Sequence, residues 1–469
     1  MYSNQHQHEI PKDAILNFLQ QNAENMTDQA QSKNHHRVLI VSYLFPPCGE
    51  SGVQRNLKYS KYLPQFGWKP YVLTVKDIVY HSYDYSFLDQ LPEEVVVVRT
   101  ESLDPYRVAA VLHNLFKSKR NNRQKQTQKS QHGASRLLRW YRNVRDWFIF
   151  PDTCYPWIPF AFLKGLSTIR NDKIEAIIAS VWPYSSAIVA YLLSKATGIP
   201  FVLDFRDGWT DDPYLVRPTK FHKFAHSVLE RWVVSRANVV CSYGDYLRDR
   251  FAERFPNLRL EVLTNGYDPE DFANIKPALK NPGFRRIVYS GSLYGYHDAF
   301  FKSILDALCC MSPNVLDNFE IVFVGRVEIP NAQYLVAERG LEQHVKLVGY
   351  VPHRTAIGYL LSADALLFAL PAADVSSYSG KIFEYIMTKK PIIAYVNDRG
   401  IAADLIREIG CGAWIVPPGQ EKRFAEMITS ISNLGWAELQ NSNIEKFSRK
   451  DLTRRLAKIL ESLIVKHDR

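Results

Sequence analysis

The residue types best suited to chemistry lie in one stretch late in the chain, Ser376–Tyr395, which reads SSYSGKIFEYIMTKKPIIAY. The pattern predicts a polar loop with Gly380, a short helix over 381–388 and a buried strand over 391–395. Ser379 is placed to cap the start of this helix. A helix start presents free N–H groups and a partial positive charge, which together suit an anionic ligand.

Two side chains of this helix carry opposite charges and face the same way. Lys381 and Glu384 are three residues apart, and this spacing puts both on one face of a helix. Such a pair suits a nucleotide diphosphate, because the cation can hold phosphate while the carboxylate holds a pair of sugar hydroxyls. The alternative is a surface loop with a solvated Lys–Glu pair, so the rest of the chain has to decide between the two.

Size and composition limit the classes of protein that this chain can be. A length of 469 residues predicts two domains of roughly 200 residues each, and 46% hydrophobic with 23% charged residues is typical of globular proteins. The net charge of +10 favours anionic partners such as nucleic acid, acidic lipid or a phosphorylated substrate. The six cysteines lack metal-binding spacing and indicate reduced, cytosolic thiols. The polar N-terminus predicts no signal peptide, and no apolar run is long enough to cross a bilayer.

The chain divides into four predicted regions. Residues 1–36 form a mobile extension rich in Gln, Asn and His, and residues 37–275 form a first domain. A second domain covers residues 276–440, and residues 441–469 contain an amphipathic C-terminal helix. The first domain is interrupted by an insertion of different composition at residues 117–162.

This insertion combines positive charge with aromatic side chains. Ten basic residues lie from Lys117 to Arg145 without an acidic one, and an aromatic cluster overlaps and follows them. Cations beside amphipathic aromatics suit an anionic membrane surface, so we expect peripheral docking on the cytoplasmic face of a membrane. The alternatives are single-stranded nucleic acid, or a flexible basic loop that leads into an ordinary core element.

Both domains show short apolar runs separated by helix-length segments, which is the pattern of doubly wound parallel sheets. In the first domain the runs are 38–42, 70–75, 95–100, 176–180, 201–205, 239–242 and 261–264. In the second domain they are 287–290, 321–325, 345–349, 365–370, 391–395 and 413–416. The sequence therefore predicts two doubly wound α/β domains in tandem, joined near residues 268–284.

Several strands of the first domain end in polar or glycine-rich segments, where open parallel sheets place their sites. The first strand runs into FPPCGESGVQR and then a predicted helix over 53–63, an arrangement that can cradle phosphate. A tight strand-to-helix turn is the alternative for this loop. The candidate cleft residues at these strand ends are Gly49, Ser51, Gly52, Trp182, Arg206 and Asp207.

The order of the motifs is similar to that of a known family. In chain order they are FPPCGESGVQR, SVWPYSS, PFVLDFRDGW, TNGYDPEDF, SGKIFEYIMTKKPIIAY and IREIGCGAWIVPPG. This order resembles the family-4 glycosyltransferases of the GT-B fold, in particular the bacterial polysaccharide and lipid-linked glycan type, from Arg37 onward. The resemblance implies two Rossmann-like domains facing across a cleft, the first for the acceptor and the second for a nucleotide-sugar, with a C-terminal helix that crosses back. It also implies a retaining transfer without a metal ion or other cofactor.

The resemblance assigns roles to residues of the second domain. Glu384 matches the second glutamate of the family's signature pair, which holds the donor ribose, whereas Ser376 stands where the first glutamate is expected. In YSGSLYGYHDAFFK no cation stands at the spacing of the family's diphosphate-binding Arg and Lys, and Lys302 lies rather far along the helix, so Lys381 becomes the preferred diphosphate cation. Arg326 is a second candidate, with a plain surface residue as the alternative. The predicted donor-binding residues are Gly291, Ser292, Arg326, Ser376, Ser379, Gly380, Lys381 and Glu384.

The predicted chemistry is stabilisation of a departing diphosphate while an oxocarbenium-like centre forms. Lys381, a helix start and the backbone amides near Gly291 and Gly380 would supply that stabilisation. If configuration is retained, the leaving phosphate can take the acceptor proton; if it is inverted, Asp207 is the candidate base. An Asp207 that pairs with Arg206 or caps a turn is the structural alternative. The predicted catalytic residues are Asp207, Lys381 and Glu384.

Two other functions remain open at this point. A nucleotide-sugar epimerase shares the two-domain fold but needs acid–base pairs that the sequence does not display, and a basic nucleic-acid-binding protein could retain a degenerate transferase fold. The expected partners are a nucleotide-sugar, a glycan or polyprenyl-linked acceptor and an anionic membrane surface, without a specific nucleic acid. The expected protein is a cytoplasmic, hexosyltransferase-like enzyme of surface polysaccharide or glycoconjugate biosynthesis.

Overall fold

The computed structural model contains two α/β domains. It describes residues 35–50, 52–76, 78, 80, 82–105, 107–108, 149–212, 219–371, 374–376, 378–410, 415–420, 422–424, 426–427 and 444–467. Residues 1–34 of the predicted extension and residues 117–148 of the predicted insertion lie outside the described residues, as does Ser51.

The N-terminal domain is built on a sheet of seven parallel strands in the order β3-β2-β1-β4-β5-β6-β7. The strands are β1 (His36–Val41), β2 (Trp68–Val75), β3 (Val96–Thr100), β4 (Ala176–Val181), β5 (Phe201–Phe205), β6 (Val239–Ser242) and β7 (Leu260–Val262). Val38 of β1 pairs with Pro70 of β2 on one side and with Ala176 of β4 on the other. The chain therefore changes direction along the sheet between β1 and β4, which is where doubly wound sheets bind their ligands.

The C-terminal domain repeats this topology with six parallel strands in the order β10-β9-β8-β11-β12-β13. The strands are β8 (Arg285–Ser290), β9 (Phe319–Val324), β10 (Val345–Gly349), β11 (Ala365–Ala369), β12 (Ile392–Tyr395) and β13 (Ile415–Val416). Its corresponding reversal lies between β8 and β11. The prediction of two doubly wound α/β domains is confirmed.

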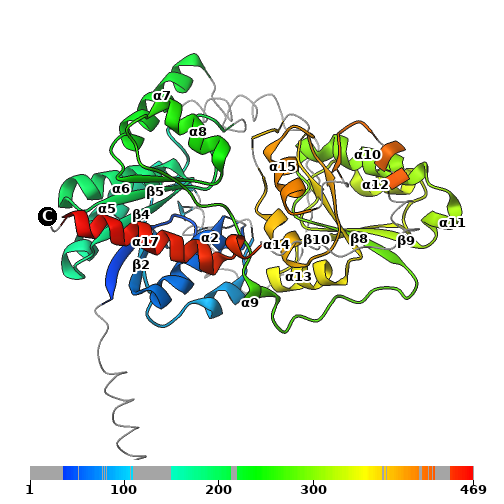
Figure 1. The fold of residues 1–469 in the computed structure, drawn as a ribbon, viewed down its shortest axis with the longest axis horizontal. Helices are drawn as coiled ribbons and strands as arrows, with labels where there is room; N and C mark the ends of the chain where they lie inside the picture. The colour runs from blue at the N-terminus through cyan, green and yellow to red at the C-terminus, as the bar shows by residue number, and fades with distance from the viewer. Residues whose placement is uncertain are drawn as a thin grey trace, which may run out of the picture.

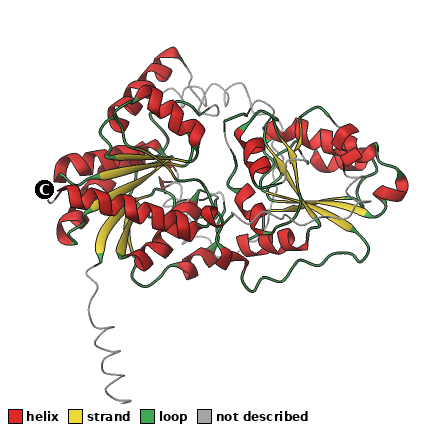
Figure 2. Cartoon of the chain, viewed as in Figure 1, coloured by secondary structure: helices red, strands yellow, loops and turns green. Residues whose placement is uncertain are grey.

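Helices cover both faces of each sheet (Figure 2). In the N-terminal domain they are α2 (Val53–Tyr62), η1 (Leu63–Phe66), η2 (Tyr85–Gln90), η3 (Tyr155–Trp157), α5 (Ile158–Asn171), α6 (Tyr184–Thr197), α7 (Lys220–Val234) and α8 (Asp245–Arg254), and α9 (Pro269–Phe272) follows in the connection. In the C-terminal domain they are η4 (Gly295–His297), α10 (Asp298–Cys309), α11 (Pro313–Leu316), α12 (Ala332–Glu338), α13 (His353–Ser362), α14 (Lys381–Met387) and α15 (Ile401–Glu408), followed by η6 (Glu445–Phe447).

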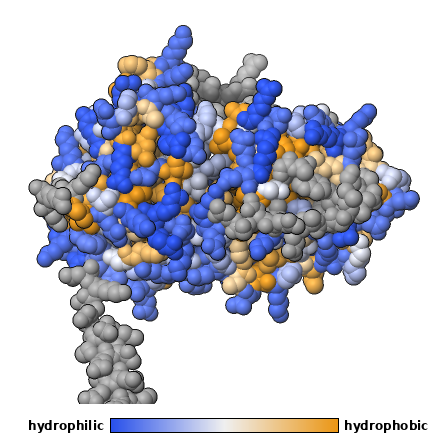
Figure 3. All heavy atoms as spheres, in the orientation of Figure 1, coloured by the Kyte–Doolittle hydropathy of each residue, from blue (hydrophilic) through white to orange (hydrophobic). Residues whose placement is uncertain are grey.

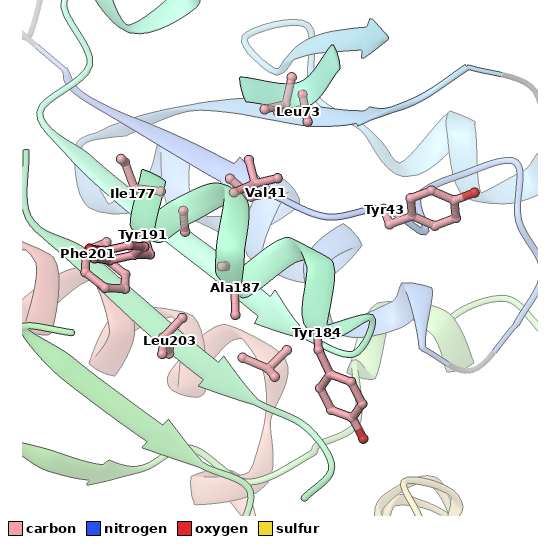
Figure 4. Packing of buried hydrophobic residues seen from close by; sticks show 14 of the residues in the cluster. Val41, Tyr43, Leu73, Ile177, Tyr184, Ala187, Tyr191, Phe201 and Leu203 are labelled. Carbon is pink, nitrogen blue, oxygen red and sulfur yellow. The ribbon is translucent and has the colours of Figure 1, made fainter. Parts of the chain in front are cut away.

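Alternate residues of each central strand point to opposite faces of the sheet. Leu39 and Val41 pack into one buried cluster, whereas Val38 and Ile40 pack into another. Figure 4 shows the first of these clusters, with Val41, Leu73, Ile177 and Leu203 from the sheet and Tyr184, Ala187 and Tyr191 from α6. Because both faces are covered, the strands read as continuous apolar runs in the sequence.

The last helix, α17 (Arg449–His467), leaves the C-terminal domain and packs on the N-terminal one. Leu452, Leu456 and Leu460 are fully buried in the same cluster as Val38 of β1. Figure 1 shows this helix in red across the N-terminal domain, beside α2. The C-terminal segment thus forms part of the N-terminal core.

The two connections between the domains pair with each other. Tyr267 of the outgoing connection forms a parallel bridge with Ser448 of the returning one. The Tyr267 N–H donates to the Phe447 carbonyl at 3.1 Å, and the Arg449 N–H donates to the Tyr267 carbonyl at 2.7 Å. A Cβ atom on Gly266 would lie 2.1 Å from the Phe447 oxygen, so this approach requires glycine.

The face of the molecule in Figure 3 is mainly hydrophilic, with smaller apolar areas between the polar side chains. Within the described residues, no helix combines the length and the apolar character needed to span a bilayer.

Candidate active site

Two glycines form a close backbone contact where β8 and β9 end. Gly291 and Gly325 have φ angles of +137° and +141°, which L side chains rarely adopt. The Gly291 N–H donates to the Val324 carbonyl at 2.7 Å, and the Gly325 N–H donates to the Gly349 carbonyl at 2.9 Å. A Cβ atom on Gly325 would lie 2.3 Å from the Gly291 oxygen. The loop predicted to approach phosphate at Gly291 is therefore paired with a second glycine loop that the sequence did not single out.

Lys381, the first residue of α14, reaches this pair of loops. Its Nζ atom donates to the Tyr289 hydroxyl at 2.9 Å and would lie 2.5 Å from a Cβ atom on Gly291. Burial lowers the pKa of Lys381 to about 8, against the opposing influence of Tyr294 and Glu384. Because its hydrogen-bond acceptor is a neutral phenol, the ammonium keeps its charge available for an anionic ligand.

Glu384 lies one turn further along α14 and is paired with a histidine that the sequence did not identify. Its Oε1 atom is 2.9 Å from Nε2 of His353, the first residue of α13. Burial opposes both charges, but the partners outweigh it, so the pKa of His353 is raised and that of Glu384 is lowered. The clue available in the sequence was only that His353 follows a strand of the second sheet.

His353 also contacts the facing domain. Its backbone N–H donates to Oδ2 of Asp84 at 2.9 Å, and its ring meets Phe87 edge-on at a centroid distance of 5.8 Å. The buried Nδ1 atom of His353 has no hydrogen-bond partner among the described residues. The carboxylate predicted to hold ribose is thus linked, through His353, to the N-terminal domain.

Arg206 forms the centre of the cluster on the N-terminal side. Its guanidinium lies 5.1 Å from the centre of the Trp182 ring and against the backbone of Gly52, where a Cβ atom would be 1.6 Å from Nη1. Its Nε atom is 3.7 Å from Oδ2 of Asp207 and has no hydrogen-bond partner in the described part of the chain. The structure therefore brings four of the predicted cleft residues together. The Asp207 side chain is 59% exposed, so it faces solvent beside Arg206.

Arg326 approaches the same region from the C-terminal domain. It lies 5.9 Å from the centre of the Tyr350 ring, and a Cβ atom on Gly49 would be 2.5 Å from the Tyr350 hydroxyl. Burial raises the pKa of Cys48 to about 12, and the charges of both Arg206 and Arg326 act against this rise. The charges of two arginines, one from each domain, thus act on the same Cys48 thiol beside the loop that contains Gly49 and Gly52.

The loop before α14 is held by tyrosines and differs in one respect from its prediction. The Tyr243 hydroxyl donates to the Ser376 carbonyl at 2.9 Å, and the Tyr378 hydroxyl donates to the Tyr243 carbonyl at 2.8 Å. The helix begins one residue later than a Ser379 cap requires, so Gly380 is the N-cap and provides no side-chain hydrogen bond. The prediction that Ser379 caps this helix is wrong, because contacts with the facing domain set the path of the loop.

The remaining predicted donor-site residues, Ser292 and Gly380, make few contacts with the other site residues. The Ser292 carbonyl accepts from the Tyr289 hydroxyl at 3.4 Å, and Gly380 approaches the Asn265 side chain.

A polar pocket of about 440 Å³ lies beside the domain connection, away from these residues. It is lined by Lys61, Gln65, Asp89, Gln90, Leu91, Pro92, Glu270, Asp271 and Arg354. None of the predicted site residues lines that pocket. No cluster of three or more metal-ligating side chains occurs within the described ranges.

Two family models match the chain, one in each domain. The model described as "Glycosyl transferase 4-like domain" matches residues 95–266, and that described as "Glycosyl transferases group 1" matches residues 285–433. Together they cover most of the chain. The chain belongs to the family-4 glycosyltransferases of the GT-B fold, which confirms the predicted family, fold class and transferase activity.

Solved structures share this fold over almost the whole chain. A glycosyltransferase from Rickettsia africae matches with a TM-score of 0.57 and 14% identity, covering 92% of this chain and 99% of its own. Sucrose-phosphate synthase from Thermosynechococcus elongatus matches with a TM-score of 0.55 and 13% identity, covering 92% and 98%. WaaG, a glycosyltransferase involved in lipopolysaccharide biosynthesis, matches with a TM-score of 0.50 and 12% identity, covering 92% and 98%. No curated protein sequence matches the chain.

Proposed function

We propose that this glycosyltransferase moves a sugar from a nucleotide-sugar donor to a glycan or lipid-linked acceptor, with retention of anomeric configuration. The observation that carries the proposal is the position of the half-buried Lys381 ammonium against the glycine loop at Gly291. A half-buried cation beside a glycine turn suits the diphosphate of a donor. In this proposal the positive charge comes from the protein, and no metal ion or other cofactor is invoked.

The charge that develops on the leaving diphosphate would be stabilised by Lys381 and by backbone N–H groups near Gly380. The Gly291 N–H is not one of them, because it donates to the Val324 carbonyl. This stabilisation raises the rate of transfer, because the negative charge on the diphosphate grows as the bond to the sugar breaks and is therefore larger in the transition state than in the bound donor. Glu384 would hold the donor ribose, as in the family resemblance, and His353 would have to share or release that carboxylate when the donor binds.

The acceptor would lie on the N-terminal side, near Arg206, Trp182 and Gly52. A guanidinium stacked on an indole presents both a charged edge and an apolar face, and such a surface suits a sugar or a phosphorylated acceptor. In a retaining reaction the leaving phosphate takes the acceptor proton, and Asp207 then orients Arg206 instead of acting as a base. Docking of the enzyme at the cytoplasmic face of a membrane would bring it to a polyprenyl-linked acceptor.

The first experiment is a thermal-shift screen of nucleotide-sugars, followed by transfer from the labelled donor that stabilises the chain most. Lys381→Ala and Glu384→Ala are expected to raise the donor KM or abolish turnover. Lys302→Ala is the matched control, because Lys302 belongs to the same domain but pairs with Asp298 on the surface of α10. Unchanged kinetics of the first two variants would remove these residues from the site.

The same screen distinguishes the two alternative functions. Interconversion of a nucleotide-sugar without any acceptor would identify an epimerase. Salt-sensitive binding of single-stranded nucleic acid without turnover of any donor would identify a binding protein that has kept the transferase fold.

A further inference from the structure

Helix α7 carries a stripe of exposed apolar side chains at the end of the N-terminal domain. Phe221 is 68% exposed, Phe224 65%, Val228 50% and Trp232 37%. Their spacing of three, four and four residues places them along one side of the helix. Large apolar side chains on a surface are ordinary when they are scattered, but a continuous stripe marks an interaction site.

The opposite side of α7 is firmly attached to the domain. His222, His226 and Val233 are buried, and Nε1 of Trp209 donates to Nδ1 of His226 at 3.1 Å. Thr219 caps the helix, because its side chain accepts the His222 N–H. The exposed stripe is therefore displayed by a helix whose orientation is set by buried contacts, and it is not a consequence of loose packing.

Within α7, the exposed charged side chains are all positive. Lys220, Lys223 and Arg231 are exposed, whereas Glu230, the one acidic residue within α7, is buried and paired with Arg254. On a helical projection the three basic residues lie together along one edge of the apolar stripe.

The neighbouring helix does not cancel this charge. The exposed Asp245 and Asp249 of α8 pair with Arg248, and Glu253 pairs with Arg250. The acidic residues of α8 are thus balanced on their own helix, and the positive charge of α7 has no counterpart there.

We propose that this face of α7 docks on the surface of an anionic lipid bilayer, with Phe221, Phe224 and Trp232 in the interface and the basic edge at the headgroups. Apolar and aromatic side chains beside Lys and Arg are the composition of helices that lie in a membrane interface, and the basic edge complements acidic lipid. A protein partner would need an apolar surface with its own acidic edge. An anionic bilayer has both an apolar interior and acidic headgroups at its surface.

A described residue that follows the basic residues of the insertion contacts α7, which supports the choice of a bilayer. Phe150, close behind the last of its ten basic residues, packs on His226 of α7 at a centroid distance of 4.9 Å. In the sequence, the ten basic residues therefore end at Arg145, five positions before a residue that contacts the helix carrying the stripe. Figure 3 shows pale orange apolar side chains beside blue hydrophilic ones at the end of the domain where Figure 1 places α7.

The test is flotation of the full chain with phosphatidylcholine vesicles, with and without phosphatidylglycerol. The native chain is expected to float with the anionic vesicles and much less with the neutral ones. Phe221→Ser together with Phe224→Ser should lower the partition coefficient by about tenfold or more, because the apolar contact is lost. Replacing Lys220, Lys223 and Arg231 by Gln should lower it by roughly fivefold for each charge and weaken its dependence on salt.

Tyr334→Ser on α12 is the matched control, because Tyr334 is also an aromatic residue, 64% exposed, on a helix of the other domain. This variant should float like the native chain. Donor binding and transfer to a soluble acceptor should be unchanged in the α7 variants, which separates this proposal from the proposed transfer reaction.

Two results would overturn the proposal. One is undiminished flotation of the Phe221/Phe224 double variant with anionic vesicles while its thermal stability remains native. The other is native chain that fails to bind vesicles but forms a dimer that the double variant cannot form, since the stripe would then be a contact between copies of the chain.

Discussion

Nε2 of His353 lies 2.9 Å from Oε1 of Glu384, while the backbone N–H of the same histidine donates to Asp84 of the facing domain at 2.9 Å. One residue thus connects the carboxylate predicted to hold the donor ribose with a loop of the N-terminal domain. Domain arrangement and donor binding are therefore expected to influence each other through His353.

The His353–Glu384 pair should make stability depend on pH. The pKa of His353 is raised above 6.5, so its contribution is complete below 6.5 and is lost as pH rises through the raised value. The pKa of Glu384 is lowered below 4.5, so its contribution is complete above 4.5 and is lost as pH falls through the lowered value. His353→Gln is expected to lower the free energy of unfolding, measured in urea, by about 1–2 kcal/mol between pH 4.5 and pH 6.5. The loss should be smaller at pH values well outside this range. A cost that stays constant from acid to alkaline pH would contradict the pairing.

A double variant provides the control for this pair. If the two side chains act through each other, His353→Gln combined with Glu384→Gln should be less destabilising than the sum of the single changes.

Donor binding should weaken as pH rises through about 8, the lowered pKa of Lys381. Lys381 carries its charge below that value, so its attraction for a diphosphate is complete there and is lost above it. Titration calorimetry with nucleoside diphosphates should show this fall in affinity, and proton uptake on binding near pH 8. Lys381→Met should weaken binding by about tenfold to a hundredfold and remove the pH dependence. Lys302→Met should leave both unchanged, and a pH dependence that survives in Lys381→Met would assign it to another group.

Gly52→Ala should act through Arg206. The added methyl group would occupy the position of the guanidinium, at 1.6 Å from Nη1, but a flexible arginine can move away. We expect a cost of less than about 1 kcal/mol in stability together with an increase in the acceptor KM. In combination with Arg206→Ala the glycine change should have little further effect on KM. Additive losses in the double variant would show that Gly52 has a separate role.

Gly325→Ala should be one of the most destabilising single changes in the C-terminal domain. Its φ of +141° is unfavourable for alanine, and its Cβ atom would lie 2.3 Å from the backbone oxygen of Gly291, which cannot move aside as a side chain can. A loss of about 2–4 kcal/mol is expected in chemical unfolding. Gly340→Ala is the control, because Gly340 also has a positive φ, +66°, but open space around it, so only about 1 kcal/mol should be lost. Equal losses in both variants would mean that the contact with Gly291 is unimportant.

The strands were predictable because each is buried on both faces and therefore appears as a short apolar run. The run at 201–205 coincides with β5, and the run at 345–349 coincides with β10. The run at 261–264 is displaced from β7 at Leu260–Val262, since the register with β6, and not hydrophobicity, decides where that edge strand ends.

Capping was less predictable than the strands. Ser379 has the right residue type for an N-cap, yet Gly380 takes that position because Tyr243 and Tyr378 tie the preceding loop to the N-terminal domain. Local preference for a cap amounts to about 1 kcal/mol, and contacts between domains can override it.

The sequence by itself determined the two doubly wound domains, the approximate positions of their strands along the chain and the placement of Lys381 and Glu384 on one helix face, because these follow from apolar periodicity and short spacing. Only the tertiary structure decided the partners of those two residues. Lys381 meets a tyrosine 92 positions away, and Glu384 meets a histidine 31 positions away. Such contacts depend on how strands from distant parts of the chain are ordered in the sheet, and no local pattern in the sequence records them.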